Sequence, residues 1–325
     1  MTNDVKLDIA IASYPHTAPL LNGEVRIKGV APNFIRVVPQ IAAYRRMVRQ
    51  VEFDVCEIAP TTYLIARAYG APFVALPIFV TRRFHHSGLL VRADAGISHP
   101  KDLEGRKVGV RAYSVTTGVW TRGILIDDYG LDSSRVTWVV DDEEHVRELE
   151  LPDNVVHAPA DRSLADMMAA GELSAGFDAN AGIGRSGSPT GGGWKQVEAN
   201  YPELFANAEE LEAAWYNKTG IYPMHGTIVV RDEILAAHPS IVQSLYDAFS
   251  EAKMLWLARL RSGEADTASD KKYRQLAKIV GDDPLPFGMK QNLSTIQALE
   301  DTAFKQKLTP RRMPIEELFV DPEEA

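Results

Sequence analysis

The segment Phe79-Val-Thr-Arg-Arg-Phe-His-His-Ser87 separates two apolar runs, Pro72-Phe-Val-Ala-Leu-Pro-Ile78 and Ser87-Gly-Leu-Leu-Val91. The first run predicts a buried strand. The second predicts a strand that leaves the first sheet for a second lobe. Two arginines and two histidines lie between these strands, which suits a site that holds an anion and moves a proton. A solvated basic loop is the alternative interpretation.

Upstream of this segment, predicted strands at 7–12 and 53–58 alternate with predicted helices at 41–50 and 60–68. This alternation indicates a mostly parallel sheet. Ligands of such sheets collect at the carboxyl ends of the strands. The polar segments that follow the strands, namely Ser13–Thr17, Glu57–Thr62 and Phe79–His86, are therefore expected to meet at one edge.

A second lobe is predicted from Ala93 onward, with strands at 106–110, 136–140 and 175–178. Thr116 or Thr117 is expected to cap a helix that runs to Asp128. The charge run 141–150 is interpreted as a solvated loop or short helix. The glycine-rich stretch 181–193 is interpreted as a mobile loop, either a lid or a connector.

The strand predicted at 221–230 is expected to cross back to the first lobe, and a helix with an apolar stripe at 242, 245, 249, 252 and 256 follows it. We therefore expect a two-lobed α/β protein with two crossing strands and a site in the inter-lobe cleft. Lobe 1 would comprise residues 1–92 and 224–325, and lobe 2 residues 93–223.

The composition narrows the function classes. A formal net charge of −9 argues against a nucleic-acid-binding protein. The one cysteine, Cys56, excludes an intrachain disulfide and is expected to be a buried, inert thiol. No apolar run reaches the roughly 18 residues of a membrane helix, and the N-terminus does not resemble a signal peptide. We therefore expect a cytoplasmic protein with no membrane partner, and homo-oligomer formation is left open.

Seven motifs in order along the chain resemble the 4,5-dihydroxyphthalate decarboxylase family. The more specific ones are Arg83-Phe-His-His-Ser87 and Thr219-Gly-Ile-Tyr-Pro-Met-His225. The others are Glu52-Phe-Asp-Val-Cys-Glu57, Pro72-Phe-Val-Ala-Leu-Pro-Ile-Phe79, Asp102-Leu-Glu-Gly-Arg-Lys-Val-Gly-Val110, Val119-Trp-Thr-Arg-Gly-Ile-Leu125 and Glu317-Leu-Phe319.

This chain departs from the family at two arginines. It has Tyr14-Pro15-His16 where the family has Tyr-Asp-Arg, and His85 where the family has Arg. The resemblance implies a type 2 periplasmic-binding-protein-like scaffold and a lyase of aromatic-compound and phthalate degradation. It also implies a small aromatic carboxylate substrate. The two replacements bear on the dianionic phthalate substrate more than on the fold.

The candidate catalytic residues are three histidines, His86, His16 and His225, of which His86 matches the family's histidine. Each could instead be a structural histidine bonded to a backbone carbonyl. The candidate substrate-binding residues are polar groups near strand ends and helix starts: Tyr14, Glu57, Arg82, Arg83, His85, Thr116, Thr117, Asp178 and Arg185. His16, His85, His86, His225 and Glu57 could gather around a divalent metal, but no His-x-His or His-x-x-x-His spacing supports such a site. We therefore expect that no cofactor is required, and a divalent metal is the alternative.

The expected reaction is a non-oxidative decarboxylation. Loss of CO2 from an aryl carbon becomes feasible once that carbon is protonated, and a phenolate para to the carboxylate pushes charge onto it. Such a site needs a base for the phenol, an acid for the ring and cations that orient the carboxylates. The alternatives are a solute-binding or sensor protein for an aromatic carboxylate, or another lyase or hydrolase on the same scaffold.

Overall fold

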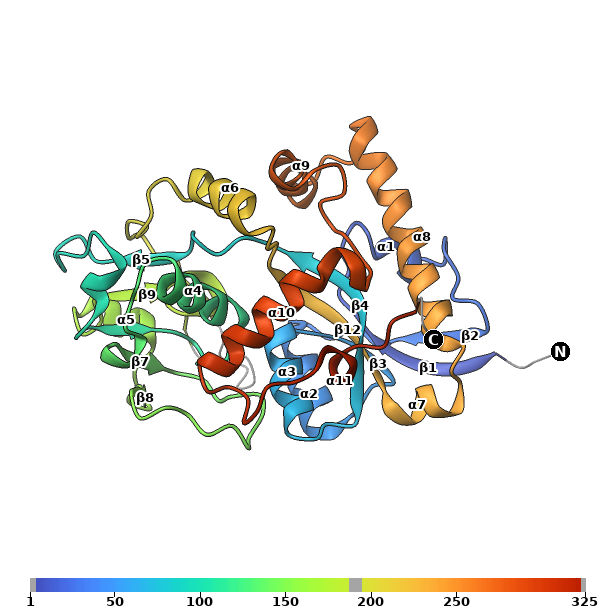
Figure 1. The fold of residues 1–325 in the computed structure, drawn as a ribbon, viewed down its shortest axis with the longest axis horizontal. Helices are drawn as coiled ribbons and strands as arrows, with labels where there is room; N and C mark the ends of the chain where they lie inside the picture. Colours follow the sequence, from blue (N-terminus) through green and yellow to red (C-terminus); the bar gives the residue numbers. More distant parts are fainter. Residues whose placement is uncertain (1–3, 187–194, 323–325) are drawn as a thin grey trace. The chain divides into compact units, whose positions relative to one another are not determined.

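The computed structural model describes residues 4–186 and 195–322 of the chain (Figure 1). The chain divides into two compact units. The first unit is formed by Met1–Arg83, Gly220–Ala298 and Met313–Ala325, and the second by Phe84–Thr219 and Leu299–Arg312.

The first unit is built on a five-stranded sheet with the order β2-β1-β3-β12-β4. Its strands are β1 (Val5–Ala10), β2 (Val30–Phe34), β3 (Val55–Ile58), β4 (Phe73–Arg82) and β12 (Met224–Arg231). β1 runs parallel to β2 and β3, whereas β12 is antiparallel to β3 and β4. The expected strand–helix alternation is therefore present, with one returning strand inserted into the sheet.

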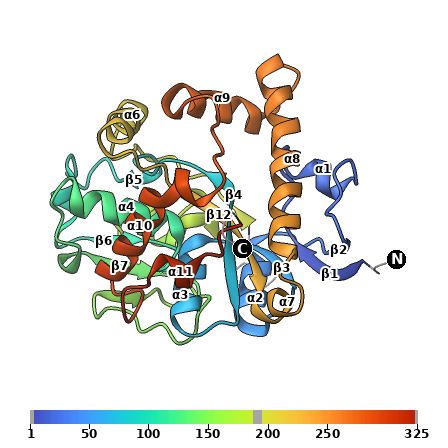
Figure 2. The same ribbon diagram turned by 45° about the vertical axis from the view of Figure 1, so that its right-hand side comes forward.

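The helices of the first unit include α1 (Ala18–Leu21), α2 (Ile41–Gln50), α3 (Pro60–Ala68), α7 (Asp232–Ala237), α8 (Ile241–Ser262), α9 (Ala268–Val280) and α11 (Ile315–Leu318). The bounds of α2 and α3 confirm the sequence prediction. The stripe predicted on α8 is buried, from Val242 to Trp256. Figure 2 shows α1 beside α8, and the two helices are in contact.

The second unit is built on a sheet with the order β5-β9-β6-β7-β8. Its strands are β5 (Leu89–Val91), β6 (Lys107–Gly109), β7 (Thr137–Val140), β8 (Val155–His157) and β9 (Ala175–Phe177), and β10 (Arg185–Ser186) pairs with β11 (Lys195–Gln196). Its helices include α4 (Thr116–Asp127), α5 (Leu164–Ala169) and α6 (Ala208–Thr219). The helix α10 (Met289–Lys305) begins in the first unit and ends in the second.

The unit boundaries differ from the expected residues 92/93 and 223/224. β5 pairs with β9, so the chain enters the second unit at Phe84. β4 is also longer than expected, because Thr81 and Arg82 still pair with β12. Phe79 to Arg82 are therefore strand residues, and the connecting segment begins at Arg83. Residues 299–312 pack with the second unit, which the sequence did not indicate.

Two local predictions at helix starts had different outcomes. The Ser163–Asp166 capping box of α5 is present. The threonine cap of α4 is wrong, because Val115 occupies the N-cap position and Thr116 and Thr117 lie inside the first turn. Cys56 is buried in β3, and burial raises the pKa of its thiol, as expected of an inert group.

Candidate active-site residues

Glu57 in the first unit is a buried carboxylate that accepts three hydrogen bonds. Ala10 pairs with Cys56, so the residues that follow β1 lie beside the end of β3. The Ala12 N–H donates to Glu57 Oε2 at 2.9 Å. The hydroxyls of Tyr14 and Tyr44 donate to Glu57 Oε1 at 2.7 and 3.0 Å. Three donors on one carboxylate fix both tyrosine rings.

Burial and hydrogen bonding set the electrostatics of Glu57 and the two tyrosines. Burial raises the pKa of Glu57, and its hydrogen bonds oppose that shift. Burial and the negative charge of Glu57 raise the pKa values of Tyr14 and Tyr44. Both phenols therefore stay protonated at neutral pH and remain donors. Tyr44 was missed by sequence reasoning, because its place on the apolar face of a helix indicated only core packing.

His16 lies next to this group and has one defined tautomer. Its Nε2 lies 2.7 Å from the carbonyl oxygen of Val80, so Nε2 carries the proton and donates it. Its ring stacks on Tyr14, with ring centres 5.2 Å apart and 11° between the planes. Nδ1 is buried and has no hydrogen-bond partner within the described residues. Burial lowers the pKa of His16 to about 4. At neutral pH, Nδ1 is therefore an unprotonated acceptor.

Arg82 and Arg83 are the candidate arginines of the first unit, and their surroundings differ. The guanidinium of Arg82 is buried and donates to the carbonyl oxygens of Tyr222 (2.6 Å) and Pro286 (3.1 Å) and to the Asn292 side chain. These contacts favour a structural role over the carboxylate binding that we expected. Arg83 is half-buried, and its charge, after burial, is a cause of the low pKa of His225.

His86 in the second unit lies in an aromatic environment. Its ring centre is 6.0 Å from that of Phe205 and 5.8 Å from that of Trp215. Its Nδ1 is buried and lacks a partner in the described part of the chain. Burial lowers the pKa of His86 to about 4, and Asp128 opposes the shift.

His85 and the start of α4 lie close together in the second unit. The His85 ring stacks on Trp120, and the Thr121 hydroxyl donates to the His85 carbonyl oxygen at 3.1 Å. Thr116 and Thr117 are buried in the first turn of the same helix. The predicted role of these threonines as carboxylate ligands stays a prediction.

Arg185 is part of a buried charge network. Its Nη2 lies 2.7 Å from Asp141 Oδ1 and 3.7 Å from Asp142 Oδ2, and Arg111 pairs with Asp142 at 3.2 Å. These contacts differ from the solvated loop or short helix expected at residues 141–150, and they favour a structural role for Arg185 over the predicted substrate binding. Asp178 is half-buried, and its N–H donates to the Gly88 carbonyl oxygen at 2.9 Å.

We expect Arg185→Met to destabilise the protein by about 3 kcal/mol or more, because it removes the cation that pairs with the buried carboxylate of Asp141. Arg162→Met is the matched control, since Arg162 pairs with Glu172 at the surface and should cost about 1 kcal/mol or less. Urea unfolding of both variants measures the difference. Equal losses of unfolding free energy in the two variants would contradict a stabilising role for the buried Arg185–Asp141 pair.

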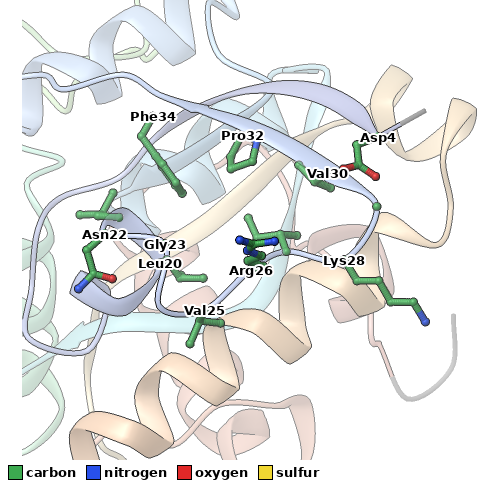
Figure 3. A pocket seen from close by; sticks show the side chains of 13 residues that line it. Asp4, Leu20, Asn22, Gly23, Val25, Arg26, Lys28, Val30, Pro32 and Phe34 are labelled. Carbon is green, nitrogen blue, oxygen red and sulfur yellow. The ribbon is translucent and has the colours of Figure 1, made fainter. Parts of the chain in front are cut away.

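A hollow of about 520 Å³ lies beside β2 in the first unit (Figure 3). Its wall is apolar at Leu20, Val25 and Phe34, with the exposed cations Arg26 and Lys28 at its rim. None of the candidate catalytic residues lines it. It is therefore separate from the histidine groups described above.

Across residues 4–186 and 195–322, no three His, Cys, Asp or Glu side chains gather in a way that could hold a metal ion. Over the same residues, no helix has the length and apolar character needed to cross a membrane. The predicted inter-lobe site stays a prediction.

Comparison with known proteins gives relatives over almost the whole chain. Residues 31–254 match the family described as ABC transporter, phosphonate, periplasmic substrate-binding protein. A relative from Comamonas testosteroni named 4,5-dihydroxyphthalate decarboxylase is 31% identical over 97% of this chain and 96% of its own. A relative of the same name from Pseudomonas putida is 38% identical over 53% of this chain and 70% of its own.

Solved structures of similar fold include periplasmic binding proteins. The alkanesulfonate-binding protein SsuA from Xanthomonas axonopodis is 14% identical, with a TM-score of 0.54 over 98% of this chain and 99% of its own. The aliphatic sulphonate binding protein SsuA from Escherichia coli is 15% identical, with a TM-score of 0.53 over 96% of each chain. At such identity the likeness speaks for the fold alone, and it confirms the predicted periplasmic-binding-protein-like class.

Proposed function

This chain belongs to the family of the 4,5-dihydroxyphthalate decarboxylases, and it also matches the family of phosphonate periplasmic substrate-binding proteins. We propose that it decarboxylates a hydroxylated aromatic acid. The substrate class is a 4,5-dihydroxyphthalate-like acid with a hydroxyl para to the departing carboxylate. The observation that carries the proposal is a buried neutral histidine, His16, with an unprotonated Nδ1 that has no partner in the described chain.

The proposed chemistry is balanced without an oxidant. The phenol loses its proton, and charge moves to the ring carbon that bears the carboxylate. That carbon gains a proton, the carbon–carboxylate bond breaks, and its electron pair returns to the ring as CO2 leaves. The phenolate then regains the proton that it lost, so the net reaction exchanges one CO2 for one proton and requires no organic cofactor.

We assign the phenol proton to His16. Its Nε2–H is held by the Val80 carbonyl, so only Nδ1 can accept a proton. The pKa of about 4 makes that nitrogen available throughout the neutral range. Tyr14 and Tyr44, bonded to Glu57, fix the ring on which His16 stacks. This arrangement suits a base whose position matters more than its strength.

We assign the ring proton to His86. Its pKa of about 4 means that it is neutral at pH 7 before the substrate binds. An acid with two carboxylates brings negative charge, which raises the pKa of a histidine within hydrogen-bond reach. Substrate binding would then protonate His86, and His86 would pass this proton to the ring carbon.

The test is to incubate the protein with hydroxybenzoates and hydroxyphthalates and to measure CO2. We expect release from acids that carry a hydroxyl para to a carboxylate, and none from isomers with only a meta hydroxyl. Tight binding of such acids without CO2 release would instead identify a binding protein.

A further inference from the structure

Glu212 contacts the segment that follows β4 in an unusual way. This residue of α6 accepts hydrogen bonds on Oε1 from the backbone N–H groups of His86 (3.2 Å) and Ser87 (3.3 Å). The Ser87 hydroxyl lies 3.4 Å from the same oxygen. Two successive N–H groups and a hydroxyl thus converge on one carboxylate oxygen, which is the donor set of an anion-binding site.

The hydrogen bonds that Glu212 accepts from these donors are long and therefore weak. Charge-assisted hydrogen bonds are commonly about 2.7–2.9 Å long, and all three of these exceed 3.1 Å. The next N–H along the chain, that of Gly88, donates to Glu203 at 2.8 Å. Glu203 therefore accepts a hydrogen bond of ordinary length, whereas the hydrogen bonds that Glu212 accepts are long.

The charge of Glu212 is also poorly compensated. No lysine or arginine in the described residues forms an ion pair with it, and burial raises its pKa. The neighbouring charge of Glu209 adds to that shift. A carboxylate held by long bonds and opposed by burial is readily replaced by another carboxylate that fits better.

The surroundings favour an aromatic acid as that replacement. The His86 ring, whose backbone supplies one donor, lies among Phe205 and Trp215. These aromatic faces suit the ring of a benzoate-type ligand. His86 Nδ1, buried and without a partner among the described residues, adds a polar group aimed at no protein atom.

We propose that the His86 and Ser87 donors form a ligand-carboxylate site, which Glu212 occupies in the ligand-free protein and yields when an aromatic acid binds. The class of ligand rests on the proposed function. The site itself rests on the donors and on the Glu212 contacts. Glu212 thus acts as an internal competitor that any carboxylate ligand must displace.

The experiment is calorimetric titration with 3,5-dihydroxybenzoate, which has only meta hydroxyls and is therefore expected to bind without losing CO2. Glu212→Gln removes the competing charge and keeps the side-chain shape, so we expect binding about tenfold tighter than in the wild type, equal to about 1.4 kcal/mol. Glu210→Gln, an exposed change of the same charge on the same helix, should leave the affinity unchanged. The uncharged 3,5-dihydroxybenzamide should show no gain in affinity in the Glu212→Gln variant.

A second variant keeps the proposal testable if Glu212→Gln unfolds. Ser87 is exposed, so Ser87→Ala should fold, and it should weaken binding of the benzoate several-fold. If Ser87 only holds Glu212, the same change would tighten binding instead. Unchanged or weaker affinity in a folded Glu212→Gln variant, or no binding of the benzoate to it, would overturn the proposal.

These outcomes are distinct from failure of the proposed function. The Glu212→Gln gain without CO2 release from any acid would keep the carboxylate site and remove the decarboxylase. CO2 release without a gain in affinity in Glu212→Gln would keep the decarboxylase and remove the carboxylate site.

Discussion

His86→Gln is expected to lower kcat by about 100-fold or more while most of the affinity for the aromatic acid remains. The reason is that general acid catalysis typically contributes about 10²–10⁴-fold, and glutamine keeps polar contacts but cannot carry the proton. Steady-state kinetics with the acid that releases CO2 fastest measures this effect. His157→Gln, an exposed histidine of β8, is the matched control and should retain the wild-type rate.

A proton-linkage measurement separates a catalytic His86 from a structural one. In the ligand-free protein its pKa is about 4, so it is neutral at pH 6. If the ligand's charge raises that pKa, binding at pH 6 takes up a proton, and the heat of binding depends on the buffer's ionisation heat. His86→Gln should abolish this uptake. A variant that turns over at the wild-type rate would contradict the assignment and leave His16 or His225 as the acid.

His16→Gln is expected to lower kcat by a similar factor, about 100-fold or more, through loss of the base at Nδ1. Tyr44→Phe, which removes one hydrogen bond to Glu57, should have a smaller effect, because Tyr14 and Ala12 still hold the carboxylate. The same kinetic assay compares them. A His16→Gln rate within a fewfold of the wild type would show that Nδ1 takes no part in the reaction.

The pKa of His16 also predicts a pH effect on stability. The ordinary histidine value near 6.5 applies to the unfolded chain, and the folded value is about 4. Between these values the unfolded state binds more protons, so the contribution of His16 to stability is full above pH 6.5 and is lost as the pH falls toward 4. Urea unfolding should therefore show that His16→Gln loses less stability than the wild type as the pH falls from 6.5 to 4.

The sequence predicted the elements with strong periodicity but not the contacts that fix the candidate site. The stripe of α8 and the bounds of α2 and α3 follow from spacing that any amphipathic or capped helix shows. The placement of Tyr14, His16 and Glu57 together also follows from strand ends that meet at one edge. Tyr44 was missed, since an apolar helical face does not reveal a hydroxyl that reaches a carboxylate in β3.

Contacts between residues far apart in sequence could not be anticipated. Asp141 was expected in solvent, but Arg185 lies 44 residues away and pairs with it. Glu212 contacts His86 across 126 residues. Nothing in the local pattern around either acidic residue indicates its partner, because burial of a charge is decided by the tertiary fold and not by nearby spacing.

Ring protonation is the central step of this account, and decarboxylation in deuterium oxide tests it most directly. The wild-type protein is incubated with 4,5-dihydroxyphthalate in D2O, and the product is analysed by proton NMR and mass spectrometry alongside the CO2 formed. We predict one CO2 for each product molecule and one deuterium at the carbon that carried the lost carboxylate. Product without deuterium at that carbon, or no CO2 at all, would contradict the account.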